Sequence, residues 1–426
     1  MRHAILGLLV LGLSACGVDE TGVNPPDDAL WFPLGVAAHP DGRYVYVSNA
    51  VFDRRYNAGT VVVYDTVARR LLPDATVRIG LFAGELALAR KAPAVDCTGD
   101  ACQQPLRAYT VSRNDNDLIR LEVDASAGDG QGHLKCDQRG RTCGPAAEFA
   151  DFGVDGAFSP DPFGLAVDGD GLLMTHVGRG VVSRWDEGAA GGMSYRCALN
   201  LTEGATAVAR HPATGEGYVT DRFGQRIFVV QKVAPFGEAV TGVAGDPCEL
   251  RASAAITVDP STERGRTRGL AFSADGTLLY VASSTDSTLR VFDTSVGPDG
   301  PRNRLLAAIP TGGTPNLVRV AGVRPGEQRV PDGLDHGVTG AAVDDLGGGL
   351  VYVTLFEDDA VVVIDPATLS IRARIEVPGG PHDLAFLPDP SGALRAYVTL
   401  FEAHGLAVLD VQPGSDRQFS LLATVP

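Results

Sequence analysis

Three segments of the chain repeat one pattern: LGVAAHPDGRYVYVSNA (34–50), GLAFSADGTLLYVASST (269–285) and DLAFLPDPSGALRAYVTLFE (383–402). Each contains a short apolar run, a turn built on Asp or Gly, and an alternating run that carries Tyr-Val. Alternation over four to six residues, rich in β-branched side chains, is typical of β-strands. Each segment is therefore expected to form an antiparallel pair of strands.

Two further strands follow each pair. The third ends in Asp, as in VVVYD (61–65), LRVFD (289–293), VVVID (361–365) and LAVLD (406–410), and a weaker fourth follows, as in RIEVP (374–378). The unit recurs seven times between Trp31 and Pro426, with about 57 residues apiece. The predicted fold class is all-β, a seven-bladed β-propeller of four-stranded antiparallel blades.

Four copies of the motif carry a family resemblance. Tyr46-Val47-Ser48-Asn49, Tyr218-Val219-Thr220-Asp221 and the Tyr-Val-Thr of 352–354 and 397–399 are similar to the Tyr-Val-Thr-Asn repeat of bacterial YVTN-type propellers. The third unit departs from the motif, with Met-Thr-His at 174–176. This family includes lactonase-like enzymes, surface-layer-like proteins and many binding or scaffolding proteins. The resemblance therefore implies the architecture and leaves the activity open.

Composition and charge exclude some classes of protein. The chain has 52 Gly and 27 Pro among 426 residues, too many chain breakers for long helices. Its 36 basic and 52 acidic residues give a formal net charge of −16. No basic run offsets this charge, so no nucleic-acid partner is expected.

The N-terminus reads as an export signal. Residues 1–16, MRHAILGLLVLGLSAC, contain one Arg and an apolar run too short for a bilayer, which requires about 20 residues. The final Leu-Ser-Ala-Cys resembles the bacterial lipoprotein box, which implies cleavage before Cys16 and lipidation of its thiol. An ordinary signal peptide that ends near a cysteine is the alternative. Gly17, where Asp would favour the inner membrane, implies an outer-membrane lipoprotein on the periplasmic side or the cell surface.

These signals predict three regions. Residues 1–15 are the signal peptide, residues 16–30 are the lipidated Cys and a flexible tether, and residues 31–426 are the propeller. The tether is polar, acidic and Pro-containing. Its lipid anchor makes a membrane the first expected partner.

Six cysteines remain after Cys16: Cys97, Cys102, Cys136, Cys143, Cys197 and Cys248. An even number in an exported chain favours disulfides. Short spacings suggest the pairs Cys97–Cys102 and Cys136–Cys143, which leaves Cys197 for Cys248. This is one of the fifteen pairings that six cysteines allow. Zinc spacings and a C-x-x-C-H haem motif are absent from the sequence.

Candidate site residues lie in loops that a propeller brings to one face around its central channel. The metal-binding candidates are His176, His336, Glu357, His382, Glu402 and His404. Imidazole and carboxylate groups bind divalent metals or act as acid and base. The alternative is that Leu-Phe-Glu, repeated at 355–357 and 400–402, reflects duplication of a blade with an ordinary polar rim.

Other polar residues have a binding or a structural interpretation. The ligand-binding candidates on the same face are Arg113, Asn114, Arg222 and Arg268, and the charges of the three arginines suit an anion. The Asp residues that end the third strands are expected to hydrogen-bond the following turn. His39 and His211, each before a Pro in a turn, are predicted to lie on the surface.

The sequence favours a binding or scaffolding module on the channel face, with a protein, a glycan or a small ligand as partner. No catalytic residue is assigned, because the common serine-hydrolase and zinc-hydrolase signatures are absent. The alternative, implied by the resemblance, is a metal-dependent lactonase-like hydrolase that uses Asn49, Glu85, His176, His336 and His382. Its divalent metal would be the cofactor. A third hypothesis, an accessory subunit of a periplasmic redox assembly, is weakened by the missing haem motif.

Overall fold

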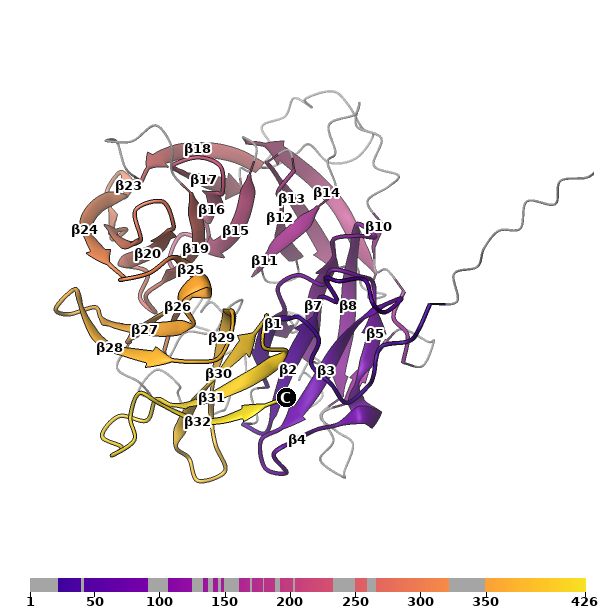
Figure 1. Cartoon of the computed structure of the whole chain (residues 1–426). Helices are drawn as coiled ribbons and strands as arrows, with labels where there is room; N and C mark the ends of the chain where they lie inside the picture. Colours follow the sequence, from indigo (N-terminus) through magenta and orange to yellow (C-terminus); the bar gives the residue numbers. More distant parts are fainter. Residues whose placement is uncertain are drawn as a thin grey trace, which may run out of the picture.

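The computed structural model describes residues 22–39, 42–90, 106–124, 133–136, 141–144, 147–148, 161–168, 171–178, 180–187, 192–201, 204–232, 250–258, 266–321 and 349–426. Within these ranges the chain forms seven antiparallel sheets of four or five strands and one two-stranded hairpin. The sheets are arranged as blades around a central axis, with the first strand of each blade innermost (Figure 1). The predicted seven-bladed β-propeller is confirmed.

The first three blades follow one another in chain order. Blade one contains β1 (Pro33–Ala38), β2 (Tyr44–Asn49), β3 (Gly59–Asp65), β4 (Arg70–Leu71), η1 (Pro73–Ala75) and β5 (Val77–Ile79). Blade two contains β6 (Ala87–Arg90), β7 (Leu106–Ser112), β8 (Asp117–Asp124), β9 (His133–Lys135) and β10 (Ala147–Glu148). Blade three contains β11 (Pro162–Asp168), β12 (Gly171–His176), β13 (Val181–Glu187) and β14 (Met193–Asn200).

The other four blades repeat this order. Blade four contains β15 (Ala205–Arg210), β16 (Gly217–Asp221), β17 (Arg226–Lys232) and β18 (Leu250–Thr257). Blade five contains β19 (Thr267–Phe272), β20 (Leu278–Ser283), β21 (Thr288–Asp293), the hairpin β22 (Val296–Gly297) with β23 (Gly300–Pro301), and β24 (Arg304–Pro310). Blade six contains β25 (Pro315–Val320), β26 (Val351–Leu355), η4 (Phe356–Asp358), β27 (Ala360–Asp365) and β28 (Ser370–Glu376). Blade seven contains β29 (Pro381–Pro388), β30 (Leu394–Leu400), β31 (Gly405–Asp410) and β32 (Ser420–Val425).

The hydrophobic core lies between neighbouring blades. The described residues form seven apolar clusters, each of which packs one blade against the next. Side chains alternate across a strand, so Tyr46 faces blade two while its neighbour Val47 faces blade seven. Because both faces of every sheet are covered, the strands read as nearly continuous apolar runs.

The ring closes without a shared strand. Blade one is built from the N-terminal strands and blade seven from the C-terminal ones. The two blades are joined by apolar contacts such as Val36 with Leu387. The backbone N–H of Val36 also donates to Oδ2 of Asp383 at 3.4 Å. Side-chain contacts between blades one and seven therefore close the ring in place of a shared strand.

The chain before β1 contacts blade one. Leu30 is buried, and Asp27 forms ion pairs with Arg78 at 3.6 Å and Arg141 at 2.9 Å. Thr76 Oγ1 donates to the Asp27 carbonyl at 2.8 Å. The last residues of the tether predicted over 16–30 therefore pack against the outer part of the first blade.

The Thr or Ser of the repeated motif links neighbouring blades. Thr399 Oγ1 accepts a hydrogen bond from the Asp383 N–H at 2.9 Å and donates to the Leu34 carbonyl of blade one at 2.9 Å. The same type of bridge joins Thr354 to Leu317 and His382, and Ser48 to Gly35 and Gly84. In blade two this position is Val111, which has no hydroxyl group with which to make the bridge.

We expect Thr399→Val to lower the free energy of unfolding by about 1–3 kcal/mol. Valine keeps the shape but leaves the buried Asp383 N–H and Leu34 carbonyl without this partner, which carries a desolvation cost of that size. Thr424→Val, at an exposed position of β32, is the matched control and should change stability by less than about 0.5 kcal/mol. Urea unfolding of the three proteins tests this, and equal midpoints for the two variants would contradict it.

Four of the Asp residues that end the third strands hydrogen-bond the next turn, as expected. Asp65 Oδ1 accepts the N–H groups of Val67 at 2.8 Å and Ala68 at 3.0 Å. The carboxylates of three equivalent residues accept an N–H two positions further on: Asp293 from Ser295, Asp365 from Ala367, and Asp410 from Gln412.

The two turn histidines are not on the surface. His39 and His211 are only 2% and 1% exposed. Nδ1 of His211 accepts the N–H groups of Ala213 at 3.1 Å and Thr214 at 3.2 Å, while Nε2 lies 3.0 Å from the Thr294 carbonyl. The prediction that both histidines are exposed is wrong. The ring of His211 is turned inward, where it accepts hydrogen bonds from the backbone of its own turn.

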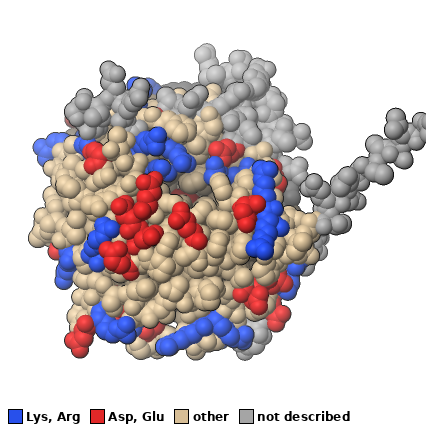
Figure 2. Space-filling view, viewed as in Figure 1, with Lys and Arg blue, Asp and Glu red and all other residues tan. Residues whose placement is uncertain are grey.

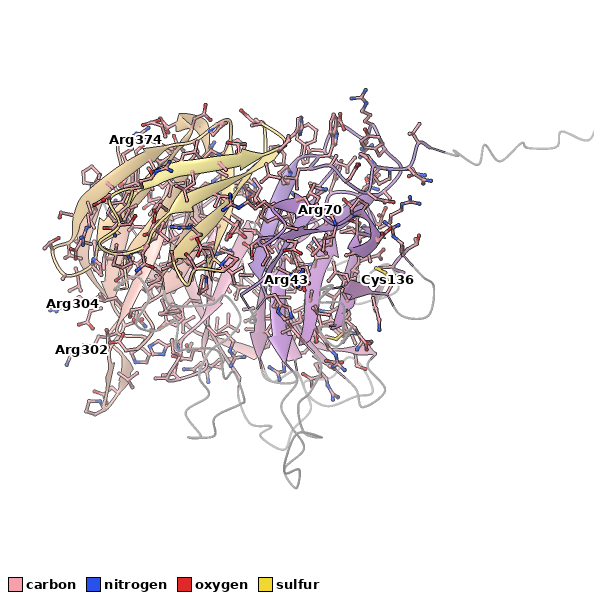
Figure 3. All side chains as sticks on the ribbon, turned by 90° about the horizontal axis from the view of Figure 1, so that it is seen from below. Arg43, Arg70, Cys136, Arg302, Arg304 and Arg374 are labelled. Carbon is pink, nitrogen blue, oxygen red and sulfur yellow. A yellow bond between two sulfur atoms is a disulfide. The ribbon has the colours of Figure 1, made fainter. Side chains whose placement is uncertain are left out.

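One predicted disulfide is present in the described residues. Cys136 and Cys143 are bonded at the outer part of blade two (Figure 3). Cys197 is buried in β14. Cys97, Cys102 and Cys248 lie outside the described residues, so the other two pairings stay predictions.

Candidate functional site

The inner strands bring equivalent residues to the central channel. Thr267, Pro315 and Pro381 start the inner strands of blades five, six and seven, and each pairs with the end of its neighbouring strand. The next residues are Arg268, Asn316 and His382, three polar side chains at one level on adjacent strands. We call the face on which these strands start the mouth face. The helical turn η4 lies on the near side of Figure 1, so that view looks onto the mouth face.

Four arginines come together at the mouth and form what we call the arginine cluster: Arg113, Arg222, Arg266 and Arg268. They come from the strand-joining loops of blades two and four and from the start of blade five. Burial, and then the like charges of Arg222 and Arg266, lower the pKa of Arg268 to about 10. Burial and repulsion by Arg113 and Arg266 likewise lower the pKa of Arg222. The positive charges are therefore close enough to repel one another.

Few carboxylates compensate this charge among the described residues. Asp161 pairs with Arg113 at 2.6 Å, and Glu357 acts on Arg268 from a distance. The Nε of Arg268 is buried and has no hydrogen-bond partner in the described part of the chain. In Figure 2, basic side chains gather just above the centre of the mouth face and acidic ones to its left. The cluster is thus a local positive site in a chain of net charge −16.

A buried ionic group lies deeper in the channel. Arg319 on β25 and Asp383 on β29 form an ion pair at 2.9 Å. Glu85, just before β6, lies within electrostatic reach of both. Burial raises the pKa of Glu85 to about 7, against the opposing charge of Arg319. Although burial acts the other way, the Asp383 and Glu85 carboxylates raise the pKa of Arg319, which stays charged.

The pairing register of the inner strands shows that Arg319 occupies a position where the other blades have a small residue. It pairs with Tyr352, and the same position of the other six inner strands is alanine: Ala37, Ala87, Ala166, Ala209, Ala271 and Ala385. The carboxylates of Asp383 and Glu85 make equivalent hydrogen bonds to a neighbouring blade. Asp383 accepts the Val36 N–H and Glu85 accepts the Leu165 N–H, each at 3.4 Å and each on the next blade.

The metal candidates that the structure describes do not assemble into one group. His176 ends β12 instead of lying in a loop, and its Nε2 is 2.8 Å from Ser183 Oγ inside the sheet. Burial lowers the pKa of His176 to about 3. His404 accepts the Phe32 N–H at Nδ1, at 3.0 Å, and stacks on Trp31.

Other metal candidates lie nearer the mouth. Burial, with help from Arg319, Arg268 and Arg222, lowers the pKa of His382 to about 3, so its ring is neutral. Glu357 and Glu402 are exposed. His336 lies outside the described residues. Within those residues, no three His, Cys, Asp or Glu side chains are grouped to hold a metal ion.

The structure brings three of the four anion-binding candidates together. Arg113, Arg222 and Arg268 are brought together, while Asn114 is exposed next to them and accepts a hydrogen bond from Arg54 at 3.1 Å. Sequence reasoning did not select Arg319 or Asp383. The available signal was the register of LVRV (317–320), where one arginine replaces the alanine of the aligned strands.

Two residues of the lactonase-like hypothesis, Asn49 and Glu85, have different surroundings in the described structure. Asn49 is buried at the end of β2, where its amide contacts Thr60 Oγ1 at 2.8 Å and the Ala29 carbonyl at 3.1 Å. Glu85 lies in the channel. This hypothesis stays a prediction, and metal analysis of the purified chain would test it.

Comparisons with known proteins show the fold. No family model matches the chain, and no curated protein matches it. A periplasmic gluconolactonase of Pseudomonas aeruginosa is similar in structure, with TM-score 0.52 and 17% identity over 92% of this chain and 95% of that one. Hydrazine synthase of Kuenenia stuttgartiensis gives TM-score 0.55 and 11% identity, over 94% and 99%. A Lactobacillus plantarum protein gives 0.53 and 16%, over 82% and 86%. At these identities the likeness concerns the propeller alone.

Proposed function

We propose that this propeller is a binding module that takes a small anionic ligand at the channel mouth. The observation that carries the proposal is the arginine cluster, in which Arg268 keeps a buried Nε–H without a partner among the described residues. Buried polar groups are normally hydrogen-bonded, so an unpaired guanidinium N–H indicates a place for an acceptor. Repulsion within the cluster adds to this, because a bound anion relieves it.

Geometry supports a small ligand. Arg222 and Arg268 are both partly exposed, so solutes reach them from the mouth face. Arginine presents several N–H donors in a planar fork that suits carboxylate, phosphate and sulfonate groups. His382 stays neutral beside them and adds no competing charge.

Inorganic pyrophosphate is expected to bind the purified protein, and Arg268→Gln or Arg222→Gln should weaken binding roughly tenfold or more. A hydrogen bond to a charged group contributes about 1.5–3 kcal/mol, which corresponds to that loss. Isothermal titration calorimetry measures it, and affinity should fall as salt is raised because screening weakens charge attraction.

Arg304→Gln is the matched control, since it removes the same charge from the outer edge of blade five (Figure 3). Its side chain is 70% exposed. Equal affinity in the wild-type protein and all three variants would show that the cluster does not bind the anion. Absence of binding to the wild-type protein would overturn the proposal for this class of ligand.

We further propose that the module is held at the outer membrane by a lipid on Cys16. The proposal is supported by the Leu-Ser-Ala-Cys box and by Gly17 after it. In the described part of the chain, no helix is both long and apolar enough to cross a bilayer. Acyl chains contribute about 0.8 kcal/mol per buried CH₂, so several on one residue hold a protein stably.

Cys16→Ser should move the protein from the membrane fraction to the soluble fraction of the cell envelope. Without the thiol, no acyl chain can be attached. Ser14→Ala, which keeps the cysteine and a small residue in the box, should leave the protein in the membrane fraction. Immunoblots of separated fractions test this, and the lipid-anchor proposal fails if the Cys16→Ser protein still sediments with membranes.

A further inference from the structure

Five phenylalanines form a continuous group on the mouth face, which we call the phenylalanine shelf: Phe32, Phe52, Phe82, Phe356 and Phe401. Ring centroids are 4.9 Å apart for Phe52 and Phe82, and 5.0 Å apart for Phe32 and Phe401. Phe401 connects the group, with Phe52 at 5.9 Å and Phe356 at 5.8 Å. Their loops belong to blades six, seven, one and two, across the ring from Arg222 and Arg268.

The shelf is not ordinary core. Phe52 is 50% exposed, and the other four rings are partly exposed. None of these five phenylalanines belongs to the seven apolar clusters that pack the blades against one another. A connected group of aromatic residues that are only partly covered, with Phe52 exposed, marks a contact surface.

Backbone strain supports the same conclusion. Phe32 and Phe82 have positive φ angles of 51° and 59°, a conformation that costs a bulky residue about 1–2 kcal/mol. Phe32 directly precedes β1, and Phe82 directly precedes Ala83, which forms a β-bridge with Ser112 at the equivalent position of blade two. Glycine fills that place in blades four and seven, as Gly204 (φ 101°) and Gly380 (φ 70°). Glycine at these two positions would avoid the strain. The chain instead has a strained residue that places an aromatic ring on the mouth face.

His382 lies beside the phenylalanine shelf and within electrostatic reach of the arginine cluster. Its ring centroid is 6.3 Å from Phe356 and 6.4 Å from Phe401. The same ring lies within electrostatic reach of Arg222 and Arg268. Arg54 adds a cation on the far side, with its guanidinium 5.1 Å from the Phe82 ring. An apolar surface of mutually tilted aromatic rings therefore borders a positive one.

We propose that the ligand of the arginine cluster is a planar aromatic anion, with its ring on the phenylalanine shelf and its carboxylate, sulfonate or phosphate on the arginines. This deepens the proposed function and rests on it. Rings stack on aromatic side chains by offset or edge contacts, which add to the apolar area they bury. An anion without a ring would leave the shelf in water, and a ring without a charge would leave the arginines unpaired.

Three probes separate these contributions in calorimetric titrations: 2-naphthoate, its neutral analogue 2-naphthamide, and acetate. We expect 2-naphthoate to bind at least tenfold more tightly than either of the others. Phe52→Ala should weaken 2-naphthoate binding about threefold to tenfold and leave pyrophosphate binding unchanged. Arg268→Gln should weaken both. Phe52 is half exposed, so the variant is expected to fold, and Leu306→Ala on the outer strand β24 is the exposed apolar control.

The outcomes distinguish the two proposals. If pyrophosphate binds but 2-naphthoate is no better than acetate, the shelf has no part in binding and this inference fails while the proposed function stands. If neither anion binds, the proposed function fails and the inference with it. If sedimentation shows a dimer that Phe52→Ala dissociates, a second copy of the chain covers the shelf and the inference is overturned.

Discussion

Arg319→Met is expected to lower the free energy of unfolding by about 3–5 kcal/mol, the cost of breaking a buried ion pair by removing one partner. The substitution leaves Asp383, which is 1% exposed, without its cation. It also removes the positive charge that acts on Glu85. Methionine fills a volume similar to that of the arginine stem, so most of the loss comes from charge.

The double variant Arg319→Met/Asp383→Asn separates the charge from the packing. Asp383 accepts the Val36 N–H at Oδ2 (3.4 Å) and the Leu384 N–H at Oδ1 (2.8 Å), and asparagine keeps one oxygen, which can accept the closer Leu384 N–H. With no buried charge left unpaired, the double variant should be more stable than Arg319→Met alone. Urea unfolding at pH 7 measures the cycle. The explanation is wrong if Arg319→Met costs less than 1 kcal/mol, or if the second substitution adds to the loss.

The architecture could be predicted because its signal is repeated and local. Each blade carries its own alternating strands and its own Asp-held turn, so seven weak patterns support one another. Even the departures were informative: the third unit lacks Tyr-Val yet keeps Thr175, whose hydroxyl accepts the Gly164 N–H at 2.8 Å. The part of the motif that matters for assembly is the hydroxyl group of its Thr or Ser, because this group hydrogen-bonds the backbone of the next blade.

The site was only partly predictable because it depends on ring closure. Arg113, Arg222 and Arg268 were selected one by one as loop cations, but their mutual repulsion arises only when blades two, four and five surround one channel. His176 was misplaced for a related reason. A polar residue after a strand reads as a loop residue, yet here it pairs with Val181 within the sheet. The Leu-Phe-Glu repeat was noticed for its glutamates, whereas the structure groups its phenylalanines.

Glu85→Gln should make the protein more stable than the wild type at pH 8 and leave it about equal near pH 4. The folded protein raises the pKa of Glu85 from the ordinary 4.5 to about 7, chiefly through burial. Between these values the folded state binds more protons at this site than the unfolded state does, so the contribution to stability falls as pH rises. One pKa unit corresponds to about 1.4 kcal/mol, which makes the full difference about 3 kcal/mol above pH 7.

Glutamine has the shape of the protonated, neutral form of Glu85 and stays neutral at every pH. Its carbonyl can still accept the Leu165 N–H that Glu85 accepts. The unfolding free energies of the two proteins should therefore diverge from about pH 5 upwards and run parallel above about pH 7.5. Glu376→Gln, whose side chain is 71% exposed on β28, is the control. A gap between wild type and Glu85→Gln that does not change with pH would mean that Glu85 ionises as it does in water. The carboxylate would then be reached by solvent, and the channel would be open as far as Arg319.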